Sequence, residues 1–252
     1  MVPMKEVSKQ DRLSHEHAHA EVILSDPEGI WRWDSPAGCA RAERRARLIA
    51  EAGLINSDSV TLEIGCGTGV FTQLVSQTGA TIIACELCES LLEIASGKSY
   101  GSEVHFLNQD AMSLGADHEE RYDVLWGSSV LHHLDLSIFL PESLKLLKPG
   151  GRFVFAEPNM LNPQIWLERK VPYFRRRAGN SEDETAFYRW SLKKLLTREG
   201  FVNISIRPHE FLHPAVPKPL IGIFQSLNKI LEHFWPISEI AGSLLIRAEK
   251  PR

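Results

Sequence analysis

The stretch Leu62-Glu63-Ile64-Gly65-Cys66-Gly67-Thr68-Gly69 decides the fold class. It follows the short apolar run 59–64, which has the pattern of a strand, and precedes residues 70–78, which have the pattern of a helix. Glycines between a strand and a helix let the backbone turn sharply and approach a ligand without obstruction by side chains. The nicotinamide fingerprint G-x-G-x-x-G would need glycine at position 70, where this chain has Val70. The stretch therefore predicts a ligand-binding turn of another spacing, G-x-G-x-G, in an α/β fold.

The same alternation of strand and helix patterns continues on the C-terminal side of this turn. Predicted strands lie at 81–85, 104–107, 122–126, 152–156, 202–207 and 243–248. Predicted helices cover 89–97 and 191–199, and a further helix carries Phe139, Leu140, Leu144 and Leu147 and ends at Pro149-Gly150-Gly151. Strands separated by helices predict βαβ crossovers and a doubly wound, mostly parallel sheet covered by helices on both faces.

Composition limits the class of protein further. The chain has 252 residues, of which 43% are hydrophobic and 24% charged, so it can bury a core without disulfide bonds. The net charge of -4 disfavours a nucleic-acid partner. The four cysteines, at 39, 66, 85 and 88, are too few for a secreted disulfide framework. No run approaches the roughly 18 apolar residues of a membrane span and no secretory leader is recognisable, so we expect a cytoplasmic protein.

Four further motifs follow the glycine turn in a fixed order. Glu86 ends the second strand, Asn108-Gln109-Asp110-Ala111 follows the third, Tyr122-Asp123-Val124-Leu125 forms the fourth, and Leu147-Lys148-Pro149-Gly150-Gly151 precedes the fifth. Together with LEIGCGTG, this set resembles the motifs of class I S-adenosylmethionine-dependent methyltransferases and covers residues 59–157. The resemblance implies a Rossmann-like seven-stranded sheet that ends in a reversed β-hairpin, and S-adenosylmethionine as the cofactor.

The resemblance also implies roles for single residues. Glu86 would accept hydrogen bonds from both ribose hydroxyls, Asp110 from the adenine amino group, and Glu63 would lie near the methionyl end. The full set of expected cofactor-binding residues is Glu63, Gly65, Cys66, Gly67, Thr68, Gly69, Glu86, Leu87, Asp110, Ala111 and Ser128. Each acidic residue has the alternative of a solvated loop carboxylate or a helix cap. Cys66 would contribute only its backbone.

The segment after the fourth strand, Gly127 to Leu134, would face the methyl group. It lacks the N-P-P-Y or D-P-P-Y pattern, which disfavours the amino nitrogens of bases and the amide nitrogens of proteins as acceptors. Histidine is a suitable general base near neutral pH, so His132 or His133 is the candidate catalytic residue, with preference for His133. The alternative is a histidine at the start of a helix that only packs against the cofactor or the loop.

Segments outside the minimal sheet are the expected substrate side of a single domain, 1–252. They are an N-terminal helical cap (1–57) and insertions at 158–190 and 214–240, around a cofactor-binding core at 58–157. Basic and aromatic residues at 166–177 could bind an anionic acceptor or form a solvated loop. An apolar helical stripe from Leu220 to Trp235 predicts a lid helix, with a homodimer contact or an interfacial helix for a lipid-linked acceptor as alternatives.

Two other patterns could suggest metal chemistry. Cys85-x-x-Cys88 lacks the second cysteine pair of a zinc site and is expected to line the adenosine pocket. His15, His17 and His19 are expected to lie in an exposed segment, and no metal site is expected. The sequence thus predicts a methyltransferase for a small-molecule or lipid- or sugar-linked acceptor. The alternatives are a cofactor-binding protein without transferase activity and a nicotinamide-dependent oxidoreductase.

Overall fold

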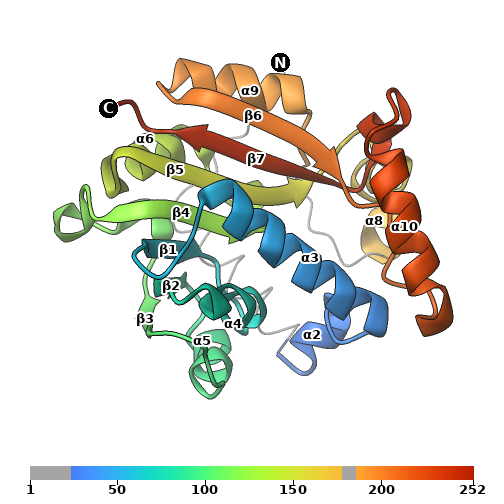
Figure 1. Cartoon of the computed structure of the whole chain (residues 1–252), viewed down its shortest axis with the longest axis horizontal. Coiled ribbons are helices and arrows are strands. Elements are labelled where there is room, and N and C mark those ends of the chain that lie inside the picture. Colours follow the sequence, from blue (N-terminus) through green and yellow to red (C-terminus); the bar gives the residue numbers. More distant parts are fainter. Residues whose placement is uncertain (1–23, 178–185) are drawn as a thin grey trace.

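The computed structural model describes residues 24–177 and 186–252. In this part of the chain, seven strands form a sheet in the order β3-β2-β1-β4-β5-β7-β6 (Figure 1). The strands are β1 (Val60–Ile64), β2 (Thr81–Glu86), β3 (Val104–Asn108), β4 (Tyr122–Ser128), β5 (Leu147–Pro158), β6 (Val202–His209) and β7 (Ser243–Glu249). The first five strands run parallel, whereas β7 pairs antiparallel with both β5 and β6. The predicted fold class, including the C-terminal antiparallel strands, is confirmed.

Helices cover both faces of this sheet. The α-helices are α2 (Pro27–Ile30), α3 (Pro36–Gly53), α4 (Val70–Val75), α5 (Glu89–Ser96), α6 (Leu136–Leu146), α7 (Pro163–Lys170), α8 (Pro172–Arg177), α9 (Arg189–Arg198) and α10 (Ile221–Leu231). Short 3-10 turns are η1 (Ser76–Thr78), η2 (Ala111–Ser113), η3 (Ala116–His118), η4 (Leu131–His133), η5 (Lys218–Leu220) and η6 (Ile237–Ile240). Side chains of α3 and α4 pack on one face of the sheet, and those of α6 and α9 pack on the other. This is the doubly wound arrangement that the alternating pattern predicts.

Helix α3 lies close to the sheet because its buried face is built from small residues. Ala42 and Ala46 are 2% and 4% exposed, and Ile49 is completely buried one turn further on. Ser35 caps the first turn by accepting from Gly38 N at 3.0 Å, and Pro36 occupies the first helical position. The small face brings the arginines of this helix close to the ends of the central strands.

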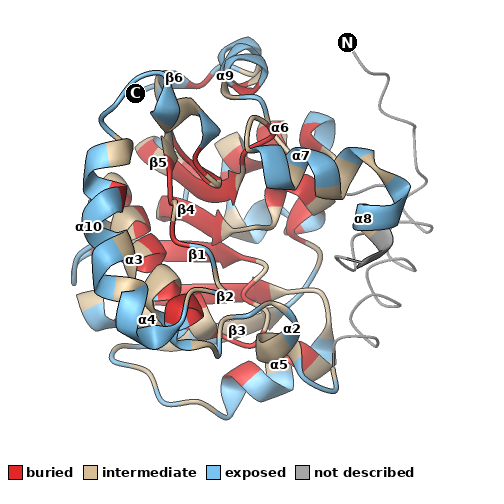
Figure 2. Ribbon diagram, turned by 90° about the vertical axis from the view of Figure 1, so that its right-hand side faces the viewer, coloured by how far each residue is buried: buried red, intermediate tan, exposed pale blue. Residues whose placement is uncertain are grey.

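The carboxyl ends of the parallel strands form one edge of the sheet. Helix α10 lies at this edge, on the right-hand side of Figure 1. Figure 2 looks onto this edge, with α3 and α10 on one side and α7 and α8 on the other. In doubly wound folds, ligands bind outside the carboxyl ends of the strands. Helices α3, α10, α7 and α8 therefore surround the edge at which a ligand is expected.

Two predicted elements differ from the structure. The fifth strand was expected at 152–156 but extends over Leu147–Pro158, because it pairs with β4 on one side and with β7 on the other. His132 and His133 were expected near the start of a helix, but they lie in the 3-10 turn η4. Asp135, which accepts from Ser137 N at 2.9 Å, caps the helix α6 that follows.

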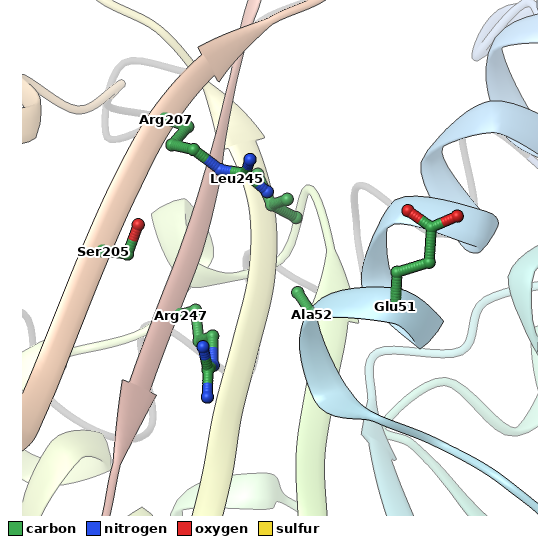
Figure 3. Close-up of a pocket in the computed structure, with 6 residues that line it drawn as sticks. All are labelled: Glu51, Ala52, Ser205, Arg207, Leu245 and Arg247. Atoms are coloured by element: carbon green, nitrogen blue, oxygen red, sulfur yellow. The ribbon is translucent and has the colours of Figure 1, made fainter.

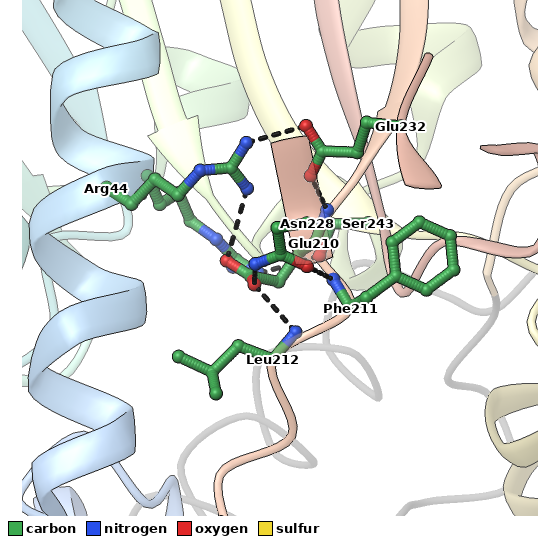
Figure 4. Close-up of polar contacts among 8 residues, drawn as sticks. Arg44, Glu210, Phe211, Leu212, Asn228, Glu232 and Ser243 are labelled. Carbon is green, nitrogen blue, oxygen red and sulfur yellow. Dashed lines mark hydrogen bonds and ion pairs between the residues drawn. The ribbon is translucent and has the colours of Figure 1, made fainter. Parts of the chain in front are cut away.

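Helix α10 is present as predicted, and its apolar stripe is partly buried: Ile221, Phe224 and Leu231 are half-buried. Ile223 and Ile230 are 58% and 61% exposed, and Asn228 is the buried residue of this helix. Polar contacts also attach the helix (Figure 4): Glu232 accepts from Arg44 at 2.6 Å and from Glu210 N at 2.7 Å. The predicted role of this helix as a lid packed over the active-site cleft stays a prediction.

Among the described helices, none combines the length and the apolar character that crossing a bilayer requires.

Candidate functional site

The glycine loop turns the chain from β1 into α4. Gly65, Gly67 and Gly69 have φ angles of +66°, +53° and +80°, which residues with side chains rarely adopt. A Cβ atom on Gly65 would lie 2.6 Å from Cγ2 of Val130. The Gly65 amide donates to the carbonyl oxygen of Cys85 at 2.8 Å, which fixes the loop to the end of β2. The loop is therefore a tight backbone turn that requires glycine at these positions.

Glu86 is the last residue of β2, and its carboxylate lies beside this loop. Its Oε2 accepts from Gly67 N at 2.9 Å, and its Oε1 accepts from Leu87 N at 2.8 Å and from Cys88 N at 3.0 Å. Asn108 on β3 donates to the carbonyl oxygens of Glu86 and Leu87. These contacts hold the carboxylate at the mouth of the loop, where it can accept hydrogen bonds from the hydroxyl groups of a ligand.

Asp110 lies at the neighbouring strand end. It follows β3, and its Oδ1 accepts from Met112 N at 3.1 Å, so it also caps η2. Ala111, next to it, is 8% exposed. Two acidic residues thus end adjacent strands beside a loop of backbone amides. This donor and acceptor set fits an adenosine group, which offers ribose hydroxyls and an adenine amino group.

The segment around α2 contacts the glycine loop. Glu28 accepts from Thr68 Oγ1 at 3.0 Å and from Lys98 Nζ at 2.6 Å. The ring of Trp31 lies 3.3 Å from the position that a Cβ atom on Gly67 would occupy. The Thr68 side chain therefore contacts the segment around α2.

Glu63 lies underneath the loop rather than on its surface. The residue is 2% exposed, and its Oε2 accepts from Thr72 Oγ1 at 2.6 Å. Burial raises the pKa of Glu63 to about 8, and the charge of Glu86 adds to this increase, whereas the hydrogen bond from Thr72 opposes it. The expected contact of Glu63 with the methionyl end of the cofactor stays a prediction.

A buried histidine–carboxylate pair joins the segment after β4 to the end of β5. His132 Nδ1 lies 2.8 Å from Glu157 Oε2, and the exposed fractions of the two side chains are 5% and 0%. Glu157 Oε1 accepts from the amides of Val130 and Leu131, each at 2.9 Å. Burial lowers the pKa of His132, and the charge of His133 lowers it further, whereas Glu157 opposes this decrease. The arrangement leaves a neutral imidazole with a fixed orientation.

Arg45 reaches the same strand ends from α3. It donates to the hydroxyl oxygens of Ser128 and Ser129 at 3.0 Å each, and to that of Ser243 at 2.8 Å. The prediction placed Ser128 in the cofactor site but missed both Arg45 and Glu157. The sequence signals for them were the arginine-rich helix at 41–47 and the acidic residue that ends the fifth strand.

The cysteines are free thiols in different surroundings. Cys85 is completely buried in the core and donates to Gln109 O. Contrary to the prediction, its side chain therefore does not line the adenosine pocket. Burial raises the pKa of Cys85 to about 12 and that of Cys66 well above its ordinary value.

Within residues 24–177 and 186–252, no group of three His, Cys, Asp or Glu side chains could hold a metal ion. The histidines at 15, 17 and 19 lie outside the described residues.

A separate pocket lies between the C-terminal part of α3 and strands β6 and β7 (Figure 3). Its lining residues are Glu51, Ala52, Ser205, Arg207, Leu245 and Arg247. Arg247 pairs in register with Val154, in the middle of β5, so the pocket lies away from the carboxyl ends of the strands. It is therefore distinct from the site formed by the glycine loop and the His132–Glu157 pair.

Comparison with known proteins agrees with this geometry. Residues 62–155 match the family described as "Methyltransferase domain". A ubiquinone biosynthesis O-methyltransferase of Saccharophagus degradans is 29% identical over 126 residues, which cover 49% of this chain and 52% of that protein. The chain thus spans about half the length of this relative.

Two solved structures share the fold over most of the chain. The N-methyltransferase NodS of Bradyrhizobium japonicum, in complex with S-adenosyl-L-homocysteine, is 19% identical with a TM-score of 0.59, and covers 94% of this chain and 98% of its own. The 1,6-didemethyltoxoflavin-N1-methyltransferase of Burkholderia thailandensis is 18% identical with a TM-score of 0.62, and covers 100% of this chain and 94% of its own. Residues 62–155 therefore match a methyltransferase domain, and the chain shares its fold with solved S-adenosylmethionine-dependent methyltransferases.

Proposed function

We propose that this protein transfers a methyl group to a hydroxyl oxygen of a small-molecule or lipid- or sugar-linked acceptor, with His132 as the general base. The observation that carries this proposal is the buried contact between His132 Nδ1 and Glu157 Oε2 at 2.8 Å. The contact lies at the carboxyl ends of β4 and β5, beside Ser128. A hydroxyl group has to lose its proton during methylation, so a fixed neutral imidazole at this edge can serve as the general base that accepts it.

The orientation of His132 follows from its contact with Glu157. An imidazole that donates its Nδ1 proton to a carboxylate keeps its lone pair on Nε2. Nε2 therefore accepts the hydroxyl proton of the acceptor, and the Glu157 carboxylate stabilises the imidazolium that results. The amides of Val130 and Leu131 hold the Glu157 carboxylate in place.

S-adenosylmethionine, when bound, supplies a methyl group that is already activated for in-line displacement. The protein contributes alignment and the exclusion of water. In this proposal, Glu86 and Asp110 hold the adenosine end, and the contacts of Glu28 with Thr68 and Lys98 close the cap over the loop.

Support for a hydroxyl acceptor comes from the relatives and from the insertions. The relative from Saccharophagus degradans is named an O-methyltransferase of ubiquinone biosynthesis. We place the acceptor between the N-terminal cap and the insertions at 158–190 and 214–240, because α2, α7, α8 and α10 surround the carboxyl ends of the strands (Figure 2). Cytoplasmic location suits the four free thiols. A homodimer through α10 stays a prediction.

The test is methyl transfer from radiolabelled S-adenosylmethionine to a panel of catechols, phenols and sugar alcohols. His132→Asn should lower kcat by about 10²- to 10⁴-fold, the usual contribution of a general base. Affinity for S-adenosylhomocysteine should stay unchanged. His133→Asn is the matched control and should keep most of the activity. Equal losses in the two variants would contradict the assignment of His132, and cofactor binding without transfer to any acceptor would contradict the proposed function.

The dependence of kcat/KM on pH gives a second test. The pKa of His132 lies below its ordinary value, so the base should remain deprotonated at neutral pH, and kcat/KM should fall only on acidification below about 6.5. Because Glu157 raises the pKa of His132, Glu157→Gln should move this acidic limb to lower pH. A limb that stays in place in this variant would show that His132 does not titrate in the reaction.

A further inference from the structure

Two arginines one turn apart on α3 both lie close to the same aromatic ring. The guanidinium carbons of Arg41 and Arg45 lie 5.4 Å and 5.2 Å from the centroid of Trp33. Arg44, between them in sequence, forms an ion pair with Glu232 at 2.6 Å. In the described part of the chain, neither Arg41 nor Arg45 has a carboxylate within ion-pair distance. Two neighbouring positive charges are therefore held together without direct neutralisation.

Arg45 is a buried cation whose hydrogen-bond partners carry no charge. The residue is 3% exposed, and its hydrogen-bond acceptors are serine hydroxyls, which carry no charge. Burial lowers the pKa of Arg45 to about 10, and the charge of Arg41 contributes to this decrease. The carboxylates of Glu210 and Glu157 act on Arg45 only as more distant charges. A buried cation without a close counter-ion is costly, so an arrangement of this kind suits a site that receives an anion.

His209 adds an unsatisfied group to the same place. The residue is 4% exposed, and neither ring nitrogen has a hydrogen-bond partner among the described residues. The Nε atom of Arg41 is likewise buried without an acceptor. Burial lowers the pKa of His209 well below its ordinary value, and the charges of Arg45, Arg44 and Arg41 add to this. The imidazole and the Arg41 guanidinium therefore offer donor positions that the protein does not fill.

The location connects this cluster to the acceptor. His209 pairs with Ser243, which pairs in turn with Pro158 at the carboxyl end of β5. Arg45 bonds to Ser128 and Ser129, which lie a few residues before His132. The cluster thus adjoins the strand ends at which we place the acceptor.

We propose that Arg41 and His209 bind an oxyanion, a carboxylate or a phosphate group, that the methyl acceptor carries. Arg45, held by its serines, adds its charge to this subsite. The inference rests on the proposed function only in assigning the anion to the acceptor, because anion binding itself requires no methyl transfer. Guanidinium groups match the geometry of both kinds of oxyanion. The subsite would make a neutral analogue of the acceptor bind more weakly than the charged one.

Inorganic phosphate serves as the minimal probe, measured by calorimetry on protein saturated with S-adenosylhomocysteine. Arg41→Gln and His209→Gln should each weaken phosphate binding by about 10- to 100-fold, the scale of a hydrogen bond to a charged group. Arg47→Gln is the matched control on the same helix, because the Arg47 side chain is 66% exposed, and it should bind phosphate as the unaltered protein does. If Arg41→Gln folds poorly, Arg41→Lys is the second variant to test. It keeps the positive charge and should therefore retain part of the affinity for phosphate.

Three results would overturn this inference. They are no phosphate binding in the unaltered protein, equal binding in Arg41→Gln and Arg47→Gln, and competition between phosphate and S-adenosylhomocysteine. The last result would assign the cations to the carboxylate of the cofactor. In the transfer assay, phosphate should compete with the acceptor and not with S-adenosylmethionine. Retained phosphate binding without methyl transfer to any acceptor would contradict the proposed function instead.

Discussion

Replacing the carboxyl group of Glu63 by an amide should change how the stability of the protein depends on pH. Burial raises the pKa of Glu63 from 4.5 to about 8 in the folded protein. The unfolded chain has the ordinary value, so the folded state binds the proton more tightly. This contribution to the free energy of unfolding is fully present below about pH 4.5 and is lost as the pH rises towards 8.

The size of the effect follows from the two pKa values. Each pKa unit corresponds to about 1.4 kcal/mol, so the complete loss is about 5 kcal/mol, of which about 3 kcal/mol falls between pH 6 and pH 9. The amide side chain in the Glu63→Gln variant has no proton to lose and can still accept from Thr72. The free energy of unfolding of Glu63→Gln, relative to the unaltered protein, should therefore rise by about 3 kcal/mol over this interval.

Urea unfolding of the ligand-free protein at about four pH values between 6 and 9 measures this difference. The other titrating groups are common to both proteins, so their effects cancel in the comparison. Glu119→Gln, at an exposed glutamate, is the control and should give a difference that does not change with pH. A difference for Glu63→Gln that is also constant would refute the claim that Glu63 is protonated inside the fold.

Three further outcomes test the site. Gly65→Ala should lower the free energy of unfolding by about 1–3 kcal/mol in thermal or urea unfolding, because φ is +66° and the new Cβ would meet Val130; an unchanged midpoint would show that the loop adapts. Glu86→Ala should weaken S-adenosylmethionine binding by about 1.5–3 kcal/mol in calorimetry, and unchanged affinity would contradict its ribose role. Iodoacetamide should modify exposed Cys39 in the folded protein, whereas Cys66 and Cys85 should react only after unfolding, as mass spectrometry would show; early labelling of Cys66 would contradict its burial.

Local patterns in the sequence were sufficient to predict the doubly wound, mostly parallel sheet and the glycine turn after its first strand. The glycine spacing at 65, 67 and 69 requires positive φ angles, and the structure has them. The contacts on the acceptor side could not be predicted in the same way. His132 and Glu157 are 25 residues apart, and Arg45 and Ser128 are 83 apart. Such pairs depend on which strand ends become neighbours, and the local pattern around each residue does not contain that information.

Helix α10 shows a second reason why the acceptor side was hard to predict. Periodicity identifies an amphipathic helix, and burial of its apolar side is the usual outcome. Here Asn228 and Glu232 attach the helix to the segment after β6, because Glu210 N and Phe211 N need acceptors there, and each bond is 2.7 Å long. Buried amides without partners are costly, so these two backbone groups favour the placement of Asn228 and Glu232 beside them. The same requirement holds Glu157, whose carboxylate accepts two amides before it can orient His132. On this side of the protein, backbone amides at strand ends therefore determine where the polar side chains lie. Hydrophobic periodicity does not predict the positions of those side chains.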